Sequence, residues 1–286
     1  MLYLSEFYFP GAEYEYGVRM GIRRTSYDSI YPFYIFPERG LDEIFFSPVT
    51  ILYGGNGSGK STALNVIAEK LGLKRETPFN RSPFFGQFVD ACRFETEEYI
   101  PEDSCIVTSD DVFDFMLNLR ALNEGVDNNR DKLMQDYYKL RDEHDFRLKS
   151  LDDYEHLRLL NSARHKTESR FVRENNLQNA REHSNGESAQ FFFQEKIKND
   201  SLCLLDEPEN SLSPQNQLKL AQYLEESVRY CGVQLIISTH SPFLLALPGA
   251  KIINLDAGSR TDMKWTELEN VRAYYDFFKN NESEFR

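Results

Sequence analysis

The chain has 286 residues, of which 41% are hydrophobic and 28% are charged, and its formal net charge is −13. This length and composition allow a buried core, which excludes a disulfide-stapled miniprotein and a wholly disordered chain. The negative charge argues against a surface that is basic overall and binds nucleic acid or anionic lipid unspecifically.

The cysteines and the apolar segments indicate where the protein works. Its four cysteines form no CxxC pair and have no histidine at metal-ligand spacing, so we expect reduced thiols in a cytoplasmic protein. The N-terminus lacks the basic start of a secretory signal. The longest uncharged run, residues 231–250, contains two prolines and two separate patterns, so we expect no membrane span.

Strand and helix patterns alternate along the chain. Aromatic residues broken by glycine and proline predict short antiparallel strands and turns over most of residues 1–53, which end in a buried strand at 48–53. Apolar residues at helical spacing predict a helix over 60–71. After a long, charged, proline-free stretch, strand patterns resume, with a helix pattern at 214–230 between two of them. Such alternation predicts an α/β protein with a mostly parallel sheet covered on both faces.

We divide the chain into four parts. Residues 1–110 hold the N-terminal β elements and the first half of the core, 111–183 a helical subdomain, 184–260 the second half of the core, and 261–286 a C-terminal helix. The side chains expected to dock this last helix on the core are Trp265, Leu268, Val271, Tyr274, Tyr275 and Phe278.

A glycine-rich motif joins the predicted strand at 48–53 to the predicted helix at 60–71. Its residues, Gly54-Gly-Asn-Gly-Ser-Gly-Lys60-Ser61, fit the pattern GxxxxGK[ST] in the context that the pattern needs, which argues against a chance turn. Backbone N–H groups of such a loop bind phosphate, the lysine reaches the β- and γ-phosphates, and the hydroxyl ligates Mg²⁺. The predicted site for ATP and Mg²⁺ comprises Gly54, Gly55, Asn56, Gly57, Ser58, Gly59, Lys60, Ser61 and Thr62.

Polar residues follow two further predicted strands. Asp206 and Glu207 come directly after four apolar residues, so that Asp206 reaches the sheet edge to hold Mg²⁺ and Glu207 deprotonates the attacking water. His240 follows the apolar strand at 233–238, where we expect its imidazole to sense an intact γ-phosphate. Each signal by itself is weak, because acids after strands and structural histidines are common. Beside the phosphate loop they predict a catalytic set of Lys60, Glu207 and His240.

The phosphate loop, the segment Ser184-Asn-Gly-Glu-Ser188, the pair Asp206-Glu207 and His240 occur in the order typical of ABC-type ATPases. Over residues 50–255 the chain resembles this family, and it is most similar to the soluble SMC and RecF-like branch, broadly called bacterial AAA-family ATPases. The resemblance implies an ATP phosphohydrolase with a P-loop NTPase fold, an ABC-ATPase-like sheet flanked by helices, and a helical insert.

The resemblance also implies a homodimer closed around two ATP molecules. In this family a signature loop grips the γ-phosphate bound to the other subunit, and the matching residues are Ser184, Asn185 and Gly186. Asn185 replaces a glycine but tolerates the left-handed conformation; an ordinary capped helix start is the alternative. For the family's Q-loop glutamine, which approaches the metal, Gln87 and the segment 109–111 compete.

The helical subdomain carries a possible partner site. If residues 157–177 form one helix, its basic residues Arg158, Lys166, Arg170 and Arg173 share one face, which suits nucleic acid or an acidic partner. A solvated face paired with nearby acids is the alternative. By resemblance we favour a switch in DNA maintenance or phage defence that controls a separate nuclease or toxin, with no membrane partner. The alternative function is the nucleotide-binding subunit of an ABC transporter.

Overall fold

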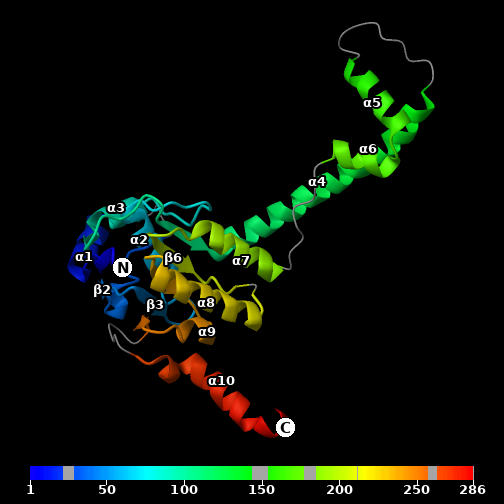
Figure 1. The fold of residues 1–286 in the computed structure, drawn as a ribbon. Helices are drawn as coiled ribbons and strands as arrows, with labels where there is room; N and C mark the ends of the chain where they lie inside the picture. The colour runs from blue at the N-terminus through cyan, green and yellow to red at the C-terminus, as the bar shows by residue number, and fades with distance from the viewer. Residues whose placement is uncertain (22–28, 144–153, 177–184, 211, 257–262, 286) are drawn as a thin grey trace. The chain divides into compact units, whose positions relative to one another are not determined.

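The computed structural model describes residues 1–21, 29–143, 154–176, 185–210, 212–256 and 263–285. The chain divides into two compact units. The first comprises Met1–Phe113 and Asn185–Arg286, and the second comprises Asp114–Ser184 (Figure 1). The first unit has strands and helices, whereas the described part of the second is helical, which confirms the predicted α/β class.

A five-stranded sheet forms the centre of the first unit. All of its pairings are parallel, and the strand order is β5-β6-β7-β3-β8. Residues that end neighbouring strands lie in register, with Asp206 opposite both Thr108 and Ser238. The strands are β3 (Val49–Tyr53), β5 (Cys105–Thr108), β6 (Leu202–Asp206), β7 (Gln234–Ser238) and β8 (Lys251–Asn254). The carboxyl ends of these strands therefore lie along one edge.

A second sheet is small and antiparallel, with the order β2-β1-β4. Its strands are β1 (Leu4–Tyr8), β2 (Glu43–Phe45) and β4 (Arg93–Thr96). The buried side chain of Gln234 joins the two sheets, because it accepts hydrogen bonds from the backbone N–H groups of Tyr3 (2.7 Å) and Leu4 (2.9 Å) and donates one to the carbonyl of Leu4 (2.8 Å). These bonds satisfy an amide that would otherwise be costly to bury.

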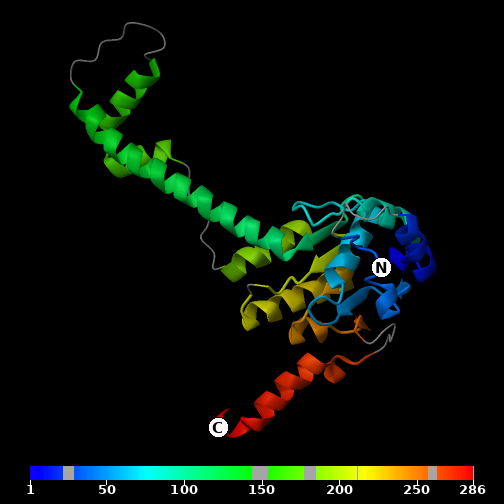
Figure 2. The same cartoon turned by 180° about the vertical axis from the view of Figure 1, so that it is seen from behind.

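Helices surround the parallel sheet in both views (Figures 1 and 2). Helix α2 packs on β5, β6 and β7, and side chains from α2, α3 and both sheets share one hydrophobic core. The α-helices that the described residues of the first unit form are α1 (Ala12–Gly21), α2 (Lys60–Leu71), α3 (Phe85–Ala91), α7 (Asn185–Lys196), α8 (Pro214–Tyr230), α9 (Pro242–Leu245) and α10 (Glu269–Asn280). Helix α4 (Ser109–Asp142) begins in this unit and continues into the second.

The second unit contains α5 (Tyr154–His165) and α6 (Glu168–Asn175) besides most of α4. The expectation of one helix over 157–177 is wrong, because Thr167 is extended and separates α5 from α6. Lys166 and Arg170 both pair with Glu174, as the alternative of a solvated face had it. Leu177 lies outside the described residues. The proposed basic stripe therefore does not form as a continuous face.

The C-terminal helix docks by fewer side chains than expected. Only Leu268 and Val271 of the six predicted residues are buried. The other four, whose exposed fractions lie between 39% and 52%, are Trp265, Tyr274, Tyr275 and Phe278. They line an open cavity of about 700 Å³ together with α8 and α9 residues. The segment contains the helix α10, but the core ends before it can cover the whole apolar face of this helix.

A buried carboxylate in α1 (Ala12–Gly21) supports the segment that leads to the phosphate loop. Glu15 is fully buried, and one of its carboxylate oxygens accepts a hydrogen bond from the backbone N–H of Tyr34 (2.6 Å), whose φ is +71°. The other oxygen has no partner. Burial raises the pKa of Glu15 to about 7, although the bond from Tyr34 opposes this shift.

Glu15 is expected to make stability depend on pH. Its pKa is raised by folding, so its contribution is fully present below about pH 4.5, the ordinary value, and is lost as the pH rises through about 7. A shift of this size corresponds to about 3 kcal/mol. Urea unfolding at pH 5 and pH 8 should show this loss in the wild type and not in Glu15→Gln. The same pH dependence in both proteins would contradict the assignment.

Candidate active site

The glycine-rich loop connects the end of β3 to the first turn of α2. Gly57 and Gly59 have φ values of +77° and +93°, which favour glycine. A Cβ added to Gly59 would lie only 2.8 Å from the Ile35 side chain. The loop therefore depends on glycine both for its backbone conformation and for its close contact with the segment before β2.

Lys60 begins α2 and is buried, with an exposed fraction of 5%. Its Nζ donates to the carbonyls of Gly54 (2.8 Å) and Gly55 (3.2 Å) and lies 2.9 Å from Nε2 of His240. Burial lowers the pKa of Lys60, while the charges of Glu207 and Asp206 oppose the shift. The ammonium group is thus held at the mouth of the loop, where it complements an anion.

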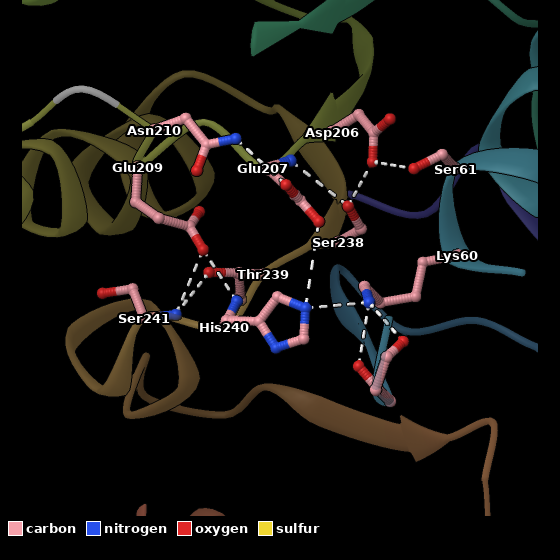
Figure 3. A network of polar contacts seen from close by, with 12 residues as sticks. Lys60, Ser61, Asp206, Glu207, Glu209, Asn210, Ser238, Thr239, His240 and Ser241 are labelled. Carbon is pink, nitrogen blue, oxygen red and sulfur yellow. Dashed lines mark hydrogen bonds and ion pairs between the residues drawn. The ribbon is translucent and has the colours of Figure 1, made fainter. Parts of the chain in front are cut away.

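Asp206 and Ser61 meet at the edge of the sheet (Figure 3). Oδ1 of Asp206 accepts hydrogen bonds from the hydroxyls of Ser61 (3.0 Å) and Ser238. Burial raises the pKa of Asp206, although both hydroxyls oppose the shift. A hydroxyl and a carboxylate oxygen side by side are the hard ligands that Mg²⁺ prefers, so this pair fits a magnesium ion that keeps several waters.

Glu207 and His240 face Lys60 from the neighbouring strand ends. Glu207 has a φ of +48°, and its Oε2 accepts a hydrogen bond from the side-chain amide of Asn210 (3.0 Å). Its Oε1 lies 3.8 Å from Nε2 of His240. The structure therefore brings Lys60, Glu207 and His240 together at the ends of separate strands (Figure 3).

A cavity of about 800 Å³ opens beside Ser61 and Asp206. Thr108, Ser109 and Asp110 line it, because β5 ends next to β6. Gln87 does not: it is exposed on α3 and is absent from the lining of this cavity among the described residues. Of the two Q-loop candidates, the structure thus brings the segment that starts at Ser109 to the site.

Thr62 is the last residue of the predicted loop set. It lines the same cavity, and its Oγ1 accepts a hydrogen bond from the hydroxyl of Tyr31 (3.2 Å). Of the three signature residues, Ser184 lies outside the described residues, and Asn185 and Gly186 begin α7. In the described ranges, the lining of the cavity includes no residue from α7.

Sequence reasoning missed two groups of residues near the loop. Asp256 accepts a hydrogen bond from the N–H of Gly55, and Arg39 binds both Asp256 (2.9 Å) and the carbonyl of Gly57 (2.9 Å). No sequence signal points to this pair, whose members are 217 residues apart. Ser238 was also missed, but it ends a predicted strand beside the one that carries Asp206, so strand pairing was a usable signal.

Comparisons with known proteins fit this geometry. The model of the AAA ATPase domain family matches residues 181–245, which is under half of the chain and includes Asp206, Glu207 and His240. No curated protein matches. With the phosphate loop beside the matched segment, the site is that of a P-loop ATPase, which binds and hydrolyses ATP.

Solved structures give a weaker likeness. A protein described as a metal-chelate type ABC transporter, in an inward-facing conformation, is 19% identical with a TM-score of 0.39, and the alignment covers 82% of each chain. The dimeric structure of a bacterial ABC transporter cassette is 16% identical with a TM-score of 0.37, over 78% of this chain and 90% of that one. At TM-scores below 0.5 these alignments do not define the fold of this chain.

Among the described residues, no helix combines the length and the apolar composition that a membrane crossing requires.

Removing the Lys60 ammonium group should weaken ATP binding. A hydrogen bond to a charged group contributes about 1.5–3 kcal/mol, so Lys60→Ala is expected to raise the Kd for ATP about 10- to 100-fold. Lys70→Ala, at the far end of α2, is the matched control and should leave the Kd unchanged. Calorimetric titration measures both, and an unchanged Kd for Lys60→Ala would remove the lysine from this role.

Proposed function

We propose that the chain is an ATP-driven dimerisation switch of the soluble, SMC and RecF-like branch of ABC-type ATPases. The observation that carries the proposal is the meeting of Lys60, Asp206, Glu207 and His240 at one edge of the parallel sheet. A lysine for phosphate, an acid for the metal, a base for water and a polar sensor are the groups that ATP hydrolysis needs.

The residues present fit Mg²⁺ and ATP. Lys60 and the loop amides hold the β- and γ-phosphates, and Ser61 and Asp206 hold the metal through oxygen. Mg²⁺ neutralises charge on the phosphate oxygens when it is bound. The roles of the individual residues are part of this proposal.

Glu207 is the proposed general base. Asn210 holds one carboxylate oxygen, and the other faces the His240 ring. In this role Glu207 orients a water molecule and accepts its proton as the oxygen attacks the γ-phosphorus. His240 donates a hydrogen bond to the γ-phosphate, and Lys60 stabilises the charge that develops there.

We propose a homodimer because the motifs of this chain follow the same order as those of ABC-type ATPases. Asn185 and Gly186 begin α7. In the family order of motifs, the segment from Ser184 to Gly186 is where we expect the signature loop that completes the site of a second copy. Because ATP then forms part of a two-fold interface, binding favours the closed dimer and hydrolysis releases it. The second, helical unit is the proposed output element.

The cellular role is proposed on the same resemblance. We favour a cytoplasmic switch in DNA maintenance or phage defence that acts on nucleic acid or controls a separate nuclease or toxin. The chain is acidic overall, with a net charge of −13, so any nucleic acid is expected to bind a local surface.

Replacing the proposed base separates binding from hydrolysis. Glu207→Gln keeps the size of the side chain but cannot accept the proton, so we expect unchanged ATP affinity and a loss of at least about 100-fold in kcat. With Mg-ATP in excess the variant should accumulate as a dimer, measured by light scattering. Glu225→Gln, at the exposed α8 pair with Arg229, is the control. A monomeric, fully active Glu207→Gln would contradict the proposal.

A bulky charge in the signature segment tests the dimer. Ser184→Arg is expected to leave ATP binding by the monomer unchanged but to block closure, so that turnover falls by at least about tenfold. Gln222→Arg places the same charge at an exposed position of α8 and should have no effect. Wild-type turnover and ATP-dependent dimerisation in Ser184→Arg would show that the segment does not act at a shared interface.

A further inference from the structure

A tight turn after β6 holds two carboxylates, Glu207 and Glu209, which contact different parts of His240. The turn is closed by hydrogen bonds from the N–H of Asn210 to the carbonyl of Glu207 (3.1 Å) and from the N–H of Leu212 to the carbonyl of Glu209 (3.0 Å). Glu207 faces the ring of His240, whereas Glu209 reaches the backbone of the same histidine (Figure 3). The same turn therefore contacts both the side chain and the backbone of His240.

Glu209 is a buried acid with an unusual set of contacts. Its exposed fraction is 8%, and its Oε1 accepts hydrogen bonds from the backbone N–H groups of His240 (2.7 Å) and Ser241 (3.1 Å). Burial raises the pKa of Glu209, while the Thr239 side chain and the backbone N–H groups of His240 and Ser241 oppose this shift. No donor lies in hydrogen-bond geometry to its Oε2, and the ion pairs of the described ranges include none with Glu209. Burying a carboxylate without a cation is costly, so a neutral residue would be the cheaper choice for stability alone.

Asn270 holds the opposite side of the same residue. Its side-chain amide donates to the carbonyl of His240 (2.9 Å), and its backbone N–H lies 3.4 Å from the hydroxyl of Tyr53. The N–H of His240 is thus bound to the turn after β6, and the carbonyl is bound to the start of α10. With both backbone groups held, the position of the imidazole beside Lys60 is constrained.

A role of Glu209 as a helix cap explains only part of its contacts. Glu209 lies next to the N-terminal end of the short helix α9. It accepts hydrogen bonds from the backbone N–H groups of His240 and Ser241 there, much as a capping side chain does. However, the Ser241 hydroxyl already accepts a hydrogen bond from Phe243 within that helix, and the shorter bond of Glu209 goes to His240, outside it. Capping therefore does not account for the contact with the histidine.

We propose that Glu209 and Asn270 are positioning residues that hold the backbone of His240, and through it the imidazole, in place against Lys60 and Glu207. The proposal rests on the proposed function, since it gives His240 a task in ATP hydrolysis. It adds that the C-terminal segment, through Asn270, takes part in setting the site.

A kinetic double-mutant cycle tests whether the two residues act through His240. We expect Glu209→Leu, which removes both acceptor oxygens, to lower kcat about tenfold with a smaller change in KM, and Asn270→Asp, which removes the amide donor, to lower it by several-fold. In the His240→Ala background both effects should shrink to less than about twofold. Full multiplication of the losses in that background would overturn the proposal.

Gln217→Leu is the matched control for this cycle. Gln217 supports the same loop, since its Oε1 accepts a hydrogen bond from the Ser241 hydroxyl (2.7 Å), but it has no hydrogen bond to the backbone of His240. Any effect of Gln217→Leu should therefore multiply with that of His240→Ala. Coupling as strong as that of Glu209 would reduce the proposal to general loop stability.

A second measurement does not depend on turnover. The protein has five histidines, and His240→Ala identifies the signal of that ring in ¹⁵N imidazole NMR of the full chain without nucleotide. Glu209→Leu and Asn270→Asp should shift the His240 signal and leave the other four in place. An unmoved His240 signal would overturn the positioning role, whereas a shifted signal in a protein that does not hydrolyse ATP would contradict the proposed function and leave the positioning role standing.

Discussion

The parallel register of the central sheet is the constraint on which the site depends. Strands β3, β6 and β7 all end at one edge, where Leu52 and Asp206 both lie opposite Ser238. The phosphate loop follows β3 directly, so its lysine lies close to the carboxylates that follow β6. A single antiparallel pairing among these strands would place one of the groups at the far edge. The parallel direction of the strands is therefore what brings these polar groups together at one edge of the sheet.

Several charged side chains of the site are buried. Lys60 and Glu209 are almost fully buried, and burial opposes the charged form of each, as it does for Asp206. The protein offsets these costs with backbone groups and hydroxyls more than with ion pairs: carbonyls for Lys60, amides for Glu209, hydroxyls for Asp206. Such groups are fixed by the fold, so they orient the charged side chains without neutralising them.

Sequence patterns predicted the strands and helices around the site better than they predicted the helices at the periphery. The strand that carries Asp206 and the helix that Lys60 begins are close to their predicted positions, because long apolar runs and a glycine-rich loop are strong local signals. The helix expected over 157–177 is broken at Thr167, and most aromatic side chains of α10 stay exposed. Helical spacing reports which side of a segment is apolar, and it does not report whether the core extends far enough to cover that side.

The amino-acid sequence by itself determined the glycine-rich loop, the order of the sequence motifs and the alternation of strands and helices, since each depends on residues that are neighbours along the chain. Only the tertiary structure decided which residues support them. Glu209 contacts His240 across 31 residues and Arg39 contacts Asp256 across 217, and Ser109, but not Gln87, reaches the cavity beside Asp206. These contacts follow from strand order and loop packing, which no local pattern encodes.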